Sequence, residues 1–456
     1  MAGIGFELRK ILQRDNLISL IQAYTYAAII SSGSWVLSII GILIIGFLSQ
    51  AIHLDGNHVT QFQVSITYII AGSLILTGPF QLSLTRFTAD RLYEKKQGIV
   101  LTNFHSIALT ATLMSGLSGL VFVLFLFPDE SVLYRILLLT SFVLLCNIWL
   151  ATIFLSGIKQ YKAIVGLYFV GYATTVLMSM VFKRWALEGL MGSFVIGHAL
   201  MLTSMWILIL RNFPAKQFIS FEIFNRKLIY PMLLWIGFLY NFGVWVDKFM
   251  FWYTPYTSSP MIGPFRASVI YDVPIFLSYL SIIPGMATFL VRMETDFVEY
   301  YDKFYNMVRE GGSLELIEEY RNRMVETIRF GIFEIVKIQF MVSLIVVVMG
   351  ERILTWLNIS TLYLPLLYVD VISASLQMVF LGILNVLFYL DRRFIVLCLT
   401  GGFAVLNIVL THISLRLGPV FFGYGFAIAM LLTVLVSFIW LTNKIEKLEY
   451  ETFMLQ

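Results

Sequence analysis

The sequence predicts an all-α polytopic membrane protein with twelve transmembrane helices in two six-helix bundles. Three observations predict it: a low charge content, twelve long apolar segments, and an uneven distribution of basic residues. Of the 456 residues, 59% are hydrophobic and 13% are charged, and the mean hydropathy is +0.86. Soluble domains carry about 25% charged residues. A composition this apolar indicates a chain that crosses the membrane many times.

Twelve segments are long enough to cross a bilayer, since a span needs about 20 predominantly apolar residues. Their predicted limits are 21–49, 62–83, 99–127, 133–157, 163–182, 189–210, 229–253, 267–291, 330–350, 363–390, 394–417 and 420–442. The division of the run 163–210 into two spans has the weakest signal.

The basic residues orient these spans. With the N-terminus in the cytoplasm, the cytoplasmic segments carry 23 of the 31 Lys and Arg residues, and the outer segments carry 6. The other two, Lys248 and Lys337, lie within spans. Cytoplasmic loops of membrane proteins are rich in Lys and Arg. The asymmetry therefore predicts that both termini are cytoplasmic.

Residues 1–20 are predicted to form an amphipathic helix at the membrane surface, because apolar residues alternate there with charges. Arg9 and Lys10 precede an apolar stretch, as in a signal peptide. That stretch, about 17–48, is much longer than the 7–15 residues of a signal sequence, and no A-x-A site follows. We expect the segment to remain attached.

The two halves of the chain show weak internal similarity. Aligning Gly33 with Gly243 also aligns Trp35 with Trp245, since both pairs are 210 residues apart (243 − 33 and 245 − 35). Internal repeats of this kind are common in transporters. Each half would start in the cytoplasm and contain six spans. The predicted repeat is therefore parallel, with its axis along the membrane normal.

The predicted bundles cover residues 21–212 and 213–443, followed by a cytoplasmic tail, 444–456. The second bundle carries a cytoplasmic insertion, 292–329, in which two amphipathic helices flank a Gly-Gly turn. The aromatic residues of this insertion either cover the chain's own membrane surface or dock a cytoplasmic partner. The sequence leaves both possibilities open.

The sequence contains none of the common catalytic or metal-binding motifs. No G-x-x-x-x-G-K-[ST], G-x-S-x-G or H-E-x-x-H occurs, and the five histidines have no metal-ligand spacing. Cys146 and Cys398 each lie in an apolar run, without a C-x-x-C partner. We expect no enzymatic activity, no cofactor and no metal site.

Asp247 and Lys248 stand side by side in the apolar stretch "LYNFGVWVDKFMFWY". A charge at the bilayer centre costs about 2.5–3.5 kcal/mol on insertion scales. Consecutive helical residues point about 100° apart, so we expect that the two charges do not simply neutralise each other. In one interpretation Lys248 reaches the outer surface while Asp247 pairs with a neighbouring helix. In the other, Asp247 lines a cavity and contacts substrate hydroxyls or a coupling cation.

Aromatic and polar residues at membrane depth complete the candidate substrate path. Trp35 and Trp245, equivalent in the repeat, could stack on sugar rings, or could pack or anchor at the interface. The candidate path comprises Ser34, Trp35, Tyr240, Asn241, Trp245, Asp247 and Lys248.

Other charged residues lie near the ends of spans. Arg86 and Arg292 follow Pro79 and Pro284 at matching positions. They either guide substrate at the cytoplasmic entrance or only set the topology. Asp370, near the outer end of its span, is expected to face water.

The opening residues add a family resemblance. "MAGIGFELRK", followed by "AYTYAAIISSGSWVLSIIGIL", closely resembles the start of the PelG family, the Pel exopolysaccharide transporters of bacterial inner membranes. Length and layout agree over the whole chain. The family is placed in the multidrug/oligosaccharidyl-lipid/polysaccharide flippase superfamily, whose two six-helix bundles match the predicted repeat.

The resemblance implies export of an N-acetylgalactosamine-rich polysaccharide from cytoplasm to periplasm across the inner membrane. It also implies the partners PelD, PelE and the glycosyltransferase PelF. It transfers no functional residues, so the candidate sites rest on the sequence alone. Three alternatives remain: a lipid-linked oligosaccharide flippase or a cation-coupled small-molecule antiporter of the same fold, and a scaffold that anchors the synthase.

Overall fold

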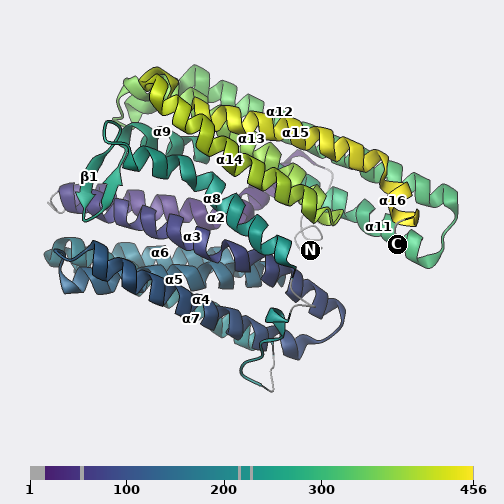
Figure 1. Ribbon diagram of the computed structural model, residues 1–456, viewed down its shortest axis with the longest axis horizontal. Coiled ribbons are helices and arrows are strands. Elements are labelled where there is room, and N and C mark those ends of the chain that lie inside the picture. The colour runs from purple at the N-terminus through teal and green to yellow at the C-terminus, as the bar shows by residue number, and fades with distance from the viewer. Residues whose placement is uncertain (1–15, 52–55, 214–216, 226–229, 455–456) are drawn as a thin grey trace. The chain divides into compact units, whose positions relative to one another are not determined.

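The computed structural model describes residues 16–51, 56–213, 217–225 and 230–454, and these are almost entirely helical (Figure 1). The N-terminal helices are α2 (Leu17–Ala51), α3 (Gly56–Tyr93), α4 (Gln97–Leu126), α5 (Val132–Gly157), α6 (Tyr161–Val181), α7 (Ala186–Asn212) and α8 (Pro231–Tyr253). They are followed by α9 (Val269–Leu280), α10 (Ile283–Val291), α11 (Val298–Glu310), α12 (Leu314–Trp356), α13 (Leu364–Tyr389), α14 (Arg393–Leu417), α15 (Tyr424–Glu446) and α16 (Leu448–Met454).

The twelve predicted spans lie mainly on helix within the described residues, which confirms the helical membrane fold. By length and hydropathy, however, ten helical segments qualify as spans within the described residues, so the number twelve is not reproduced. The two predicted spans that do not qualify correspond to α2 and α8. Asn241, Asp247 and Lys248 lower the hydropathy of α8.

The N-terminal prediction falls mainly on residues that the structure does not describe. Residues 1–15 of the predicted amphipathic helix, 1–20, lie outside the described part, and α2 begins at Leu17.

The eighth predicted span, 267–291, is broken into α9 and α10 between Leu280 and Ile283. Pro284 occupies the first turn of α10, where a proline is tolerated because the amide there needs no intrahelical partner. A π-helical segment, Arg292–Phe297, then joins α10 to α11. The region Val269–Glu310 still qualifies as one candidate span, so the interruption lies within the predicted span.

The chain divides into two compact units by its internal contacts. One contains Gly33–Trp245 and Phe251–Ser268, and the other contains Met1–Ser32, Val246–Met250 and Val269–Gln456. The bundle limits predicted from the repeat stay a prediction.

In the first of these units, α5 packs against α3, α4 and α7. Polar atoms between these helices are paired: Trp149 Nε1 donates to Ser73 Oγ at 2.9 Å, and the hydroxyls of Tyr134 and Ser65 lie 2.7 Å apart. Such pairing is needed because lipid offers no hydrogen-bond partner.

Two glycines bring α3 and α8 together. A Cβ atom on Gly237 would lie 2.1 Å from the carbonyl oxygen of Gly78, so the two backbones are in direct contact. Small residues permit this close approach of membrane helices.

A short antiparallel hairpin follows α8 and was not predicted. Its strands are β1 (Ser259–Ile262) and β2 (Phe265–Ala267), with Ser259 opposite Ala267. Gly263, at φ +49°, makes the turn. Arg266 Nε donates to the carbonyl oxygen of Trp252 at 3.1 Å, and this contact ties the hairpin to the end of α8.

In the second unit, α13 is the central helix. In its most apolar window 67% of the residues are buried, against 17% for α12. Helices α12, α14 and α15 all pack against α13, as Figure 1 shows. Most of α12 is therefore left facing the surroundings of the protein.

The predicted insertion forms the two expected helices around a glycine turn. Helix α11 ends at Glu310 and is followed by Gly311, which adopts the left-handed conformation at φ +70°. Ser313 caps α12, which continues without a break through the predicted ninth span. Phe304 is buried, and the ring of Tyr301 lies 5.3 Å from that of Tyr389 on α13. This part of the aromatic cluster thus packs against the chain itself.

The C-terminal helix α16 is held by ion pairs. Lys444 Nζ lies 2.5 Å from Glu451 Oε1, and Arg392 contacts Glu451 Oε2. Burial opposes ionisation of this carboxyl, but the hydrogen bond from Lys444 and the charge of Arg392 outweigh it and lower the pKa of Glu451. The carboxylate therefore holds α16 in place while it is ionised.

We predict that Gly237→Ala destabilises the protein by about 1–3 kcal/mol, the usual cost of overpacking. The matched control is Gly166→Ala in α6, where a Cβ meets nothing within 4 Å. An alanine in such an open helical position is expected to stabilise by about 0.5–1 kcal/mol. Thermal unfolding of the purified variants measures both. Equal midpoints for the two variants would contradict the close contact of α3 and α8.

We also predict that protonation of Glu451 releases α16. Because folding lowers the pKa of the Glu451 carboxyl, its ionised form stabilises the folded state. This contribution is fully present at a pH above the ordinary pKa of 4.5, and it is lost as the pH falls through the lowered pKa. Glu451→Gln should therefore speed backbone hydrogen exchange in α16 at pH 7. Glu446→Gln, at an exposed residue, is the control. Unchanged exchange in Glu451→Gln would show that the ion pairs do not hold the helix.

Candidate functional site: a buried charge cluster

Asp247 and Lys248 lie in the interior of one unit, 0% and 4% exposed. Lys248 Nζ lies 3.1 Å from Asp247 Oδ2 and 3.3 Å from Oδ1. The expectation that neighbouring charges would not neutralise each other was wrong, because the flexible four-carbon stem of lysine spans the angle between the two positions. The burial of Lys248 also excludes the interpretation in which it reaches the outer surface.

Two further helices supply hydrogen bonds to the Asp247 carboxylate. Tyr271 Oη on α9 donates to Oδ2 at 2.5 Å, and Asn407 Nδ2 on α14 donates to Oδ1 at 3.3 Å. Thr411 Oγ1 donates to Asn407 Oδ1 at 2.9 Å, which orients the amide so that its NH₂ group faces the aspartate. These bonds fix the carboxylate from three sides.

Aromatic rings surround the Lys248 ammonium. Lys248 Nζ donates to Tyr279 Oη at 3.3 Å and lies 4.8 Å from the centre of the Phe426 ring. Ring faces attract cations more strongly where water is excluded. The lysine is therefore held by one carboxylate, one phenol and one ring face.

Asp370 on α13 belongs to the same cluster. It is 0% exposed, and neither carboxylate oxygen has a hydrogen-bond partner within the described residues. It interacts electrostatically with Lys248 and Asp247. The expectation that Asp370 faces water was wrong. Gly423, at the start of α15, packs so closely that a Cβ there would lie 3.0 Å from Asp370 Oδ1.

The charges of this cluster do not balance. One ammonium faces two carboxylates, and an unpaired buried charge is costly. A proton or a monovalent cation would make the cluster neutral. In the part of the chain that the structure describes, no group of three or more His, Cys, Asp or Glu side chains could hold a metal.

The remaining candidates for the substrate path lie elsewhere. The side chains of Ser34 and Trp35, on α2, are outside the described part. Asn241 Nδ2 donates to the carbonyl oxygen of Gly237 at 2.9 Å, and the ring of Trp245 lies 6.3 Å from that of Trp252.

Tyr240 is half-buried on the same helix, α8. Like Asn241 and Trp245, it belongs to the other unit, and its role in a path stays a prediction.

The two arginines proposed for the entrance are both engaged in ion pairs. Arg86 Nε lies 3.1 Å from Asp90 Oδ1. Arg292 Nε lies 2.5 Å from Glu334 Oε2, and Arg292 Nη1 lies 2.9 Å from Asp296 Oδ2. Arg292 also begins the π-helical segment, a rare conformation that often occurs at functional sites.

The family of the chain follows from a comparison with family models. The PelG model, described as "Putative exopolysaccharide Exporter (EPS-E)", matches residues 1–453. This chain belongs to the PelG family. No curated protein matches it in the corresponding comparison. The resemblance found in the opening residues is thus confirmed over nearly the whole length.

Solved structures confirm the fold of this PelG-family chain. A MOP superfamily transporter from Pyrococcus furiosus has a TM-score of 0.68 at 12% identity, covering 93% of this chain and 96% of that one. An outward-facing multidrug resistance MATE family transporter has a TM-score of 0.66 at 13% sequence identity, and the match covers 94% of this chain and 96% of that one. An inward-facing MATE family transporter has a TM-score of 0.61 at 12% sequence identity, and the match covers 93% of this chain and 96% of that one. The chain therefore has the fold of MOP superfamily transporters.

Sequence reasoning missed most of the shell around Asp247. Tyr271 and Asn407 are polar residues within apolar spans, and that was the signal available for them. Nothing in the sequence shows that they converge on Asp247 from 24 and 160 residues away.

We predict that Lys248→Met destabilises the protein by about 3–5 kcal/mol, because it leaves Asp247 charged and without a counter-ion in a buried site. Adding Asp247→Asn should restore much of the loss, since the double variant buries no charge at these two positions. Unfolding of the single and double variants in detergent measures the coupling. Additive effects would show that the two charges do not depend on each other.

Proposed function

We propose that this protein exports the N-acetylgalactosamine-rich Pel polysaccharide from the cytoplasm to the periplasm across the bacterial inner membrane. The observation that carries the proposal is the match of the PelG family model over residues 1–453. The transporter fold of the structural neighbours supports it. PelF would supply the polymer, and PelD and PelE would be the membrane partners.

We further propose that the buried charge cluster couples export to a cation gradient. The support is its excess of one carboxylate, Asp370, in a site without exposed surface. When Asp370 is neutralised by a proton or monovalent cation, Lys248 is attracted to Asp247 alone. When Asp370 is ionised, it competes for the same ammonium group.

This competition would be transmitted by packing. Asp247, Tyr271, Asp370 and Asn407 lie on α8, α9, α13 and α14, so a shift of Lys248 changes bonds that join these helices. Membrane helices with two arrangements of similar energy respond to such local changes in charge. The cluster could thus switch the packing of these helices between two states, according to whether Asp370 is neutralised or ionised.

In this proposal the other candidate residues contact the polymer. Trp35 and Trp245 would stack on sugar rings, while Ser34, Tyr240 and Asn241 would hydrogen-bond to hydroxyl groups. Arg86 and Arg292 would line the cytoplasmic entrance. Each arginine would first have to leave the carboxylate that it contacts in the structure.

A second candidate function is a cation-coupled small-molecule antiporter. The observation that favours it is the same unpaired carboxylate, because a polymer driven by its own synthesis needs no coupling site. Transport of a small molecule without any glycosyltransferase present would support this alternative, whereas a strict requirement for the synthase would support polymer export.

We predict that Asp370→Asn and Asp247→Asn each reduce polymer export by roughly 5- to 150-fold. This range corresponds to a typical coupling free energy of about 1–3 kcal/mol. The assay quantifies secreted polymer in cells that have normal membrane levels of the variant. Glu351→Gln, at an exposed position of α12, is the control and should export normally. Normal export by both aspartate variants would make the cluster structural only and would contradict the coupling.

A further inference from the structure

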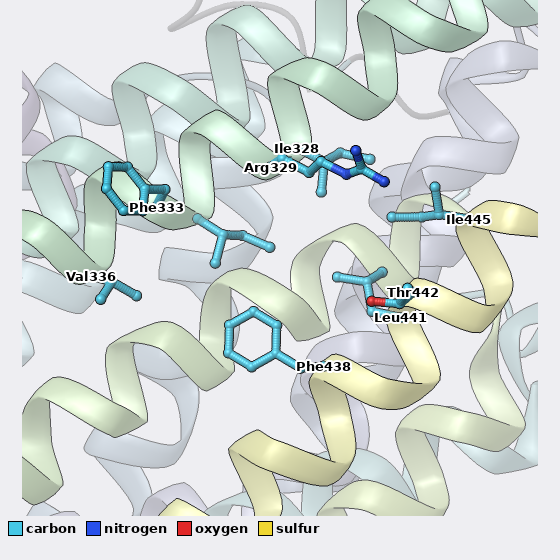
Figure 2. Close-up of a pocket in the computed structure, with 9 residues that line it drawn as sticks. Ile328, Arg329, Phe333, Val336, Phe438, Leu441, Thr442 and Ile445 are labelled. Carbon is cyan, nitrogen blue, oxygen red and sulfur yellow. The ribbon is translucent and has the colours of Figure 1, made fainter.

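A groove lies between α12 and α15, away from the charge cluster. It has a volume of about 240 Å³, and its lining is apolar except for Arg329 and Thr442. Figure 2 shows the guanidinium of Arg329 at the end nearer Ile445, and Val336 and Phe438 toward the other end. The groove is thus polar at one end and apolar at the other.

The groove results from how the helices of this unit pack. Helices α12 and α15 both pack against α13, much more than against each other. The space between them is therefore open to the side of the bundle. On α12 the pocket residues extend from Ile328 to Val336, which is about 12 Å along the helix axis.

Arg329 differs from the basic residues that precede it on α12. Arg321 Nε lies 2.7 Å from Glu449 Oε1, and Arg323 Nη1 lies 3.6 Å from Glu326 Oε2. Arg329 is exposed and makes no ion pair or hydrogen bond with any side chain in the described residues. The Arg329 guanidinium therefore has no side-chain counter-ion among the described residues, at the point where α12 enters the apolar part of the bundle.

The chemistry of the lining restricts the occupant. A soluble anion would gain nothing from side chains such as Phe333, Val336 and Phe438, and a peptide would find few hydrogen-bond partners for its backbone. A molecule with an anionic head and an apolar tail fits both the polar end and the apolar end of the groove. Basic pockets between membrane helices on the cytoplasmic side bind anionic lipid head groups. The positive-inside rule places Arg329 on that side.

We propose that this groove binds one anionic glycerophospholipid of the cytoplasmic leaflet. The phosphate contacts Arg329 and accepts a hydrogen bond from the Thr442 hydroxyl, and the first part of an acyl chain lies along Phe333, Val336 and Phe438. The site is independent of the charge cluster and of the polymer path, so it can be tested whether or not the protein exports Pel.

The test is native mass spectrometry of the purified protein after incubation with equal amounts of phosphatidylglycerol and phosphatidylcholine. Wild type should retain one phosphatidylglycerol in preference. Arg329→Ala should weaken that preference by about fivefold, the effect expected for one interfacial basic residue. Arg323→Ala, six residues earlier on the same helix, should leave this preference unchanged.

A second pair of variants tests the apolar end. Val336→Trp fills the groove and should reduce retention of phosphatidylglycerol, whereas Val348→Trp changes a residue of α12 outside the pocket lining and should not. Equal retention of the two lipids by wild type would overturn the proposal. So would equal losses in Arg329→Ala and Arg323→Ala, or in the two tryptophan variants.

Discussion

The cost of burying charge in a membrane protein is the constraint on which the centre of this molecule depends. Asp247 and Lys248 are fully enclosed, and they are tolerated because each satisfies the other at 3.1 Å. Tyr271 and Asn407 complete the shell of the carboxylate. Removing one member leaves the others without compensation, so the arrangement of α8, α9 and α14 depends on all of them.

Asp370 differs from Asp247 in this cluster, because neither of its carboxylate oxygens has a hydrogen-bond partner in the described residues. Other buried polar atoms also have no hydrogen-bond partner in the described residues, among them Ser141 Oγ and His198 Nε2, but those groups are neutral, whereas Asp370 carries a charge when it is ionised. A fully buried carboxylate without a hydrogen bond lowers the stability of the folded protein, so stability alone does not explain its presence. Intramembrane ionisable groups commonly mark ion pathways and proton relays. The proposed coupling site follows from that contrast.

The sequence predicted what depends on local composition. Apolar length located the helices, and the Gly311 turn and the start of α12 agree with the expected insertion. It failed where distant residues decide the environment. Gly423 packs against Asp370 from 53 positions away in the sequence (423 − 370), and one partner of Arg292 is Glu334, 42 residues away. The pairing of Asp247 with Lys248 depends on how the lysine stem bends, which helical geometry does not determine.

The most direct test of the account measures polymer entry into inside-out membrane vesicles supplied with nucleotide sugar. Proton and sodium gradients are collapsed with ionophores while polymer synthesis is monitored separately. If the buried cluster couples export to a cation, polymer entry falls to background although synthesis continues. Unchanged entry at an unchanged rate of synthesis would contradict the account and would mean that synthesis itself drives the polymer.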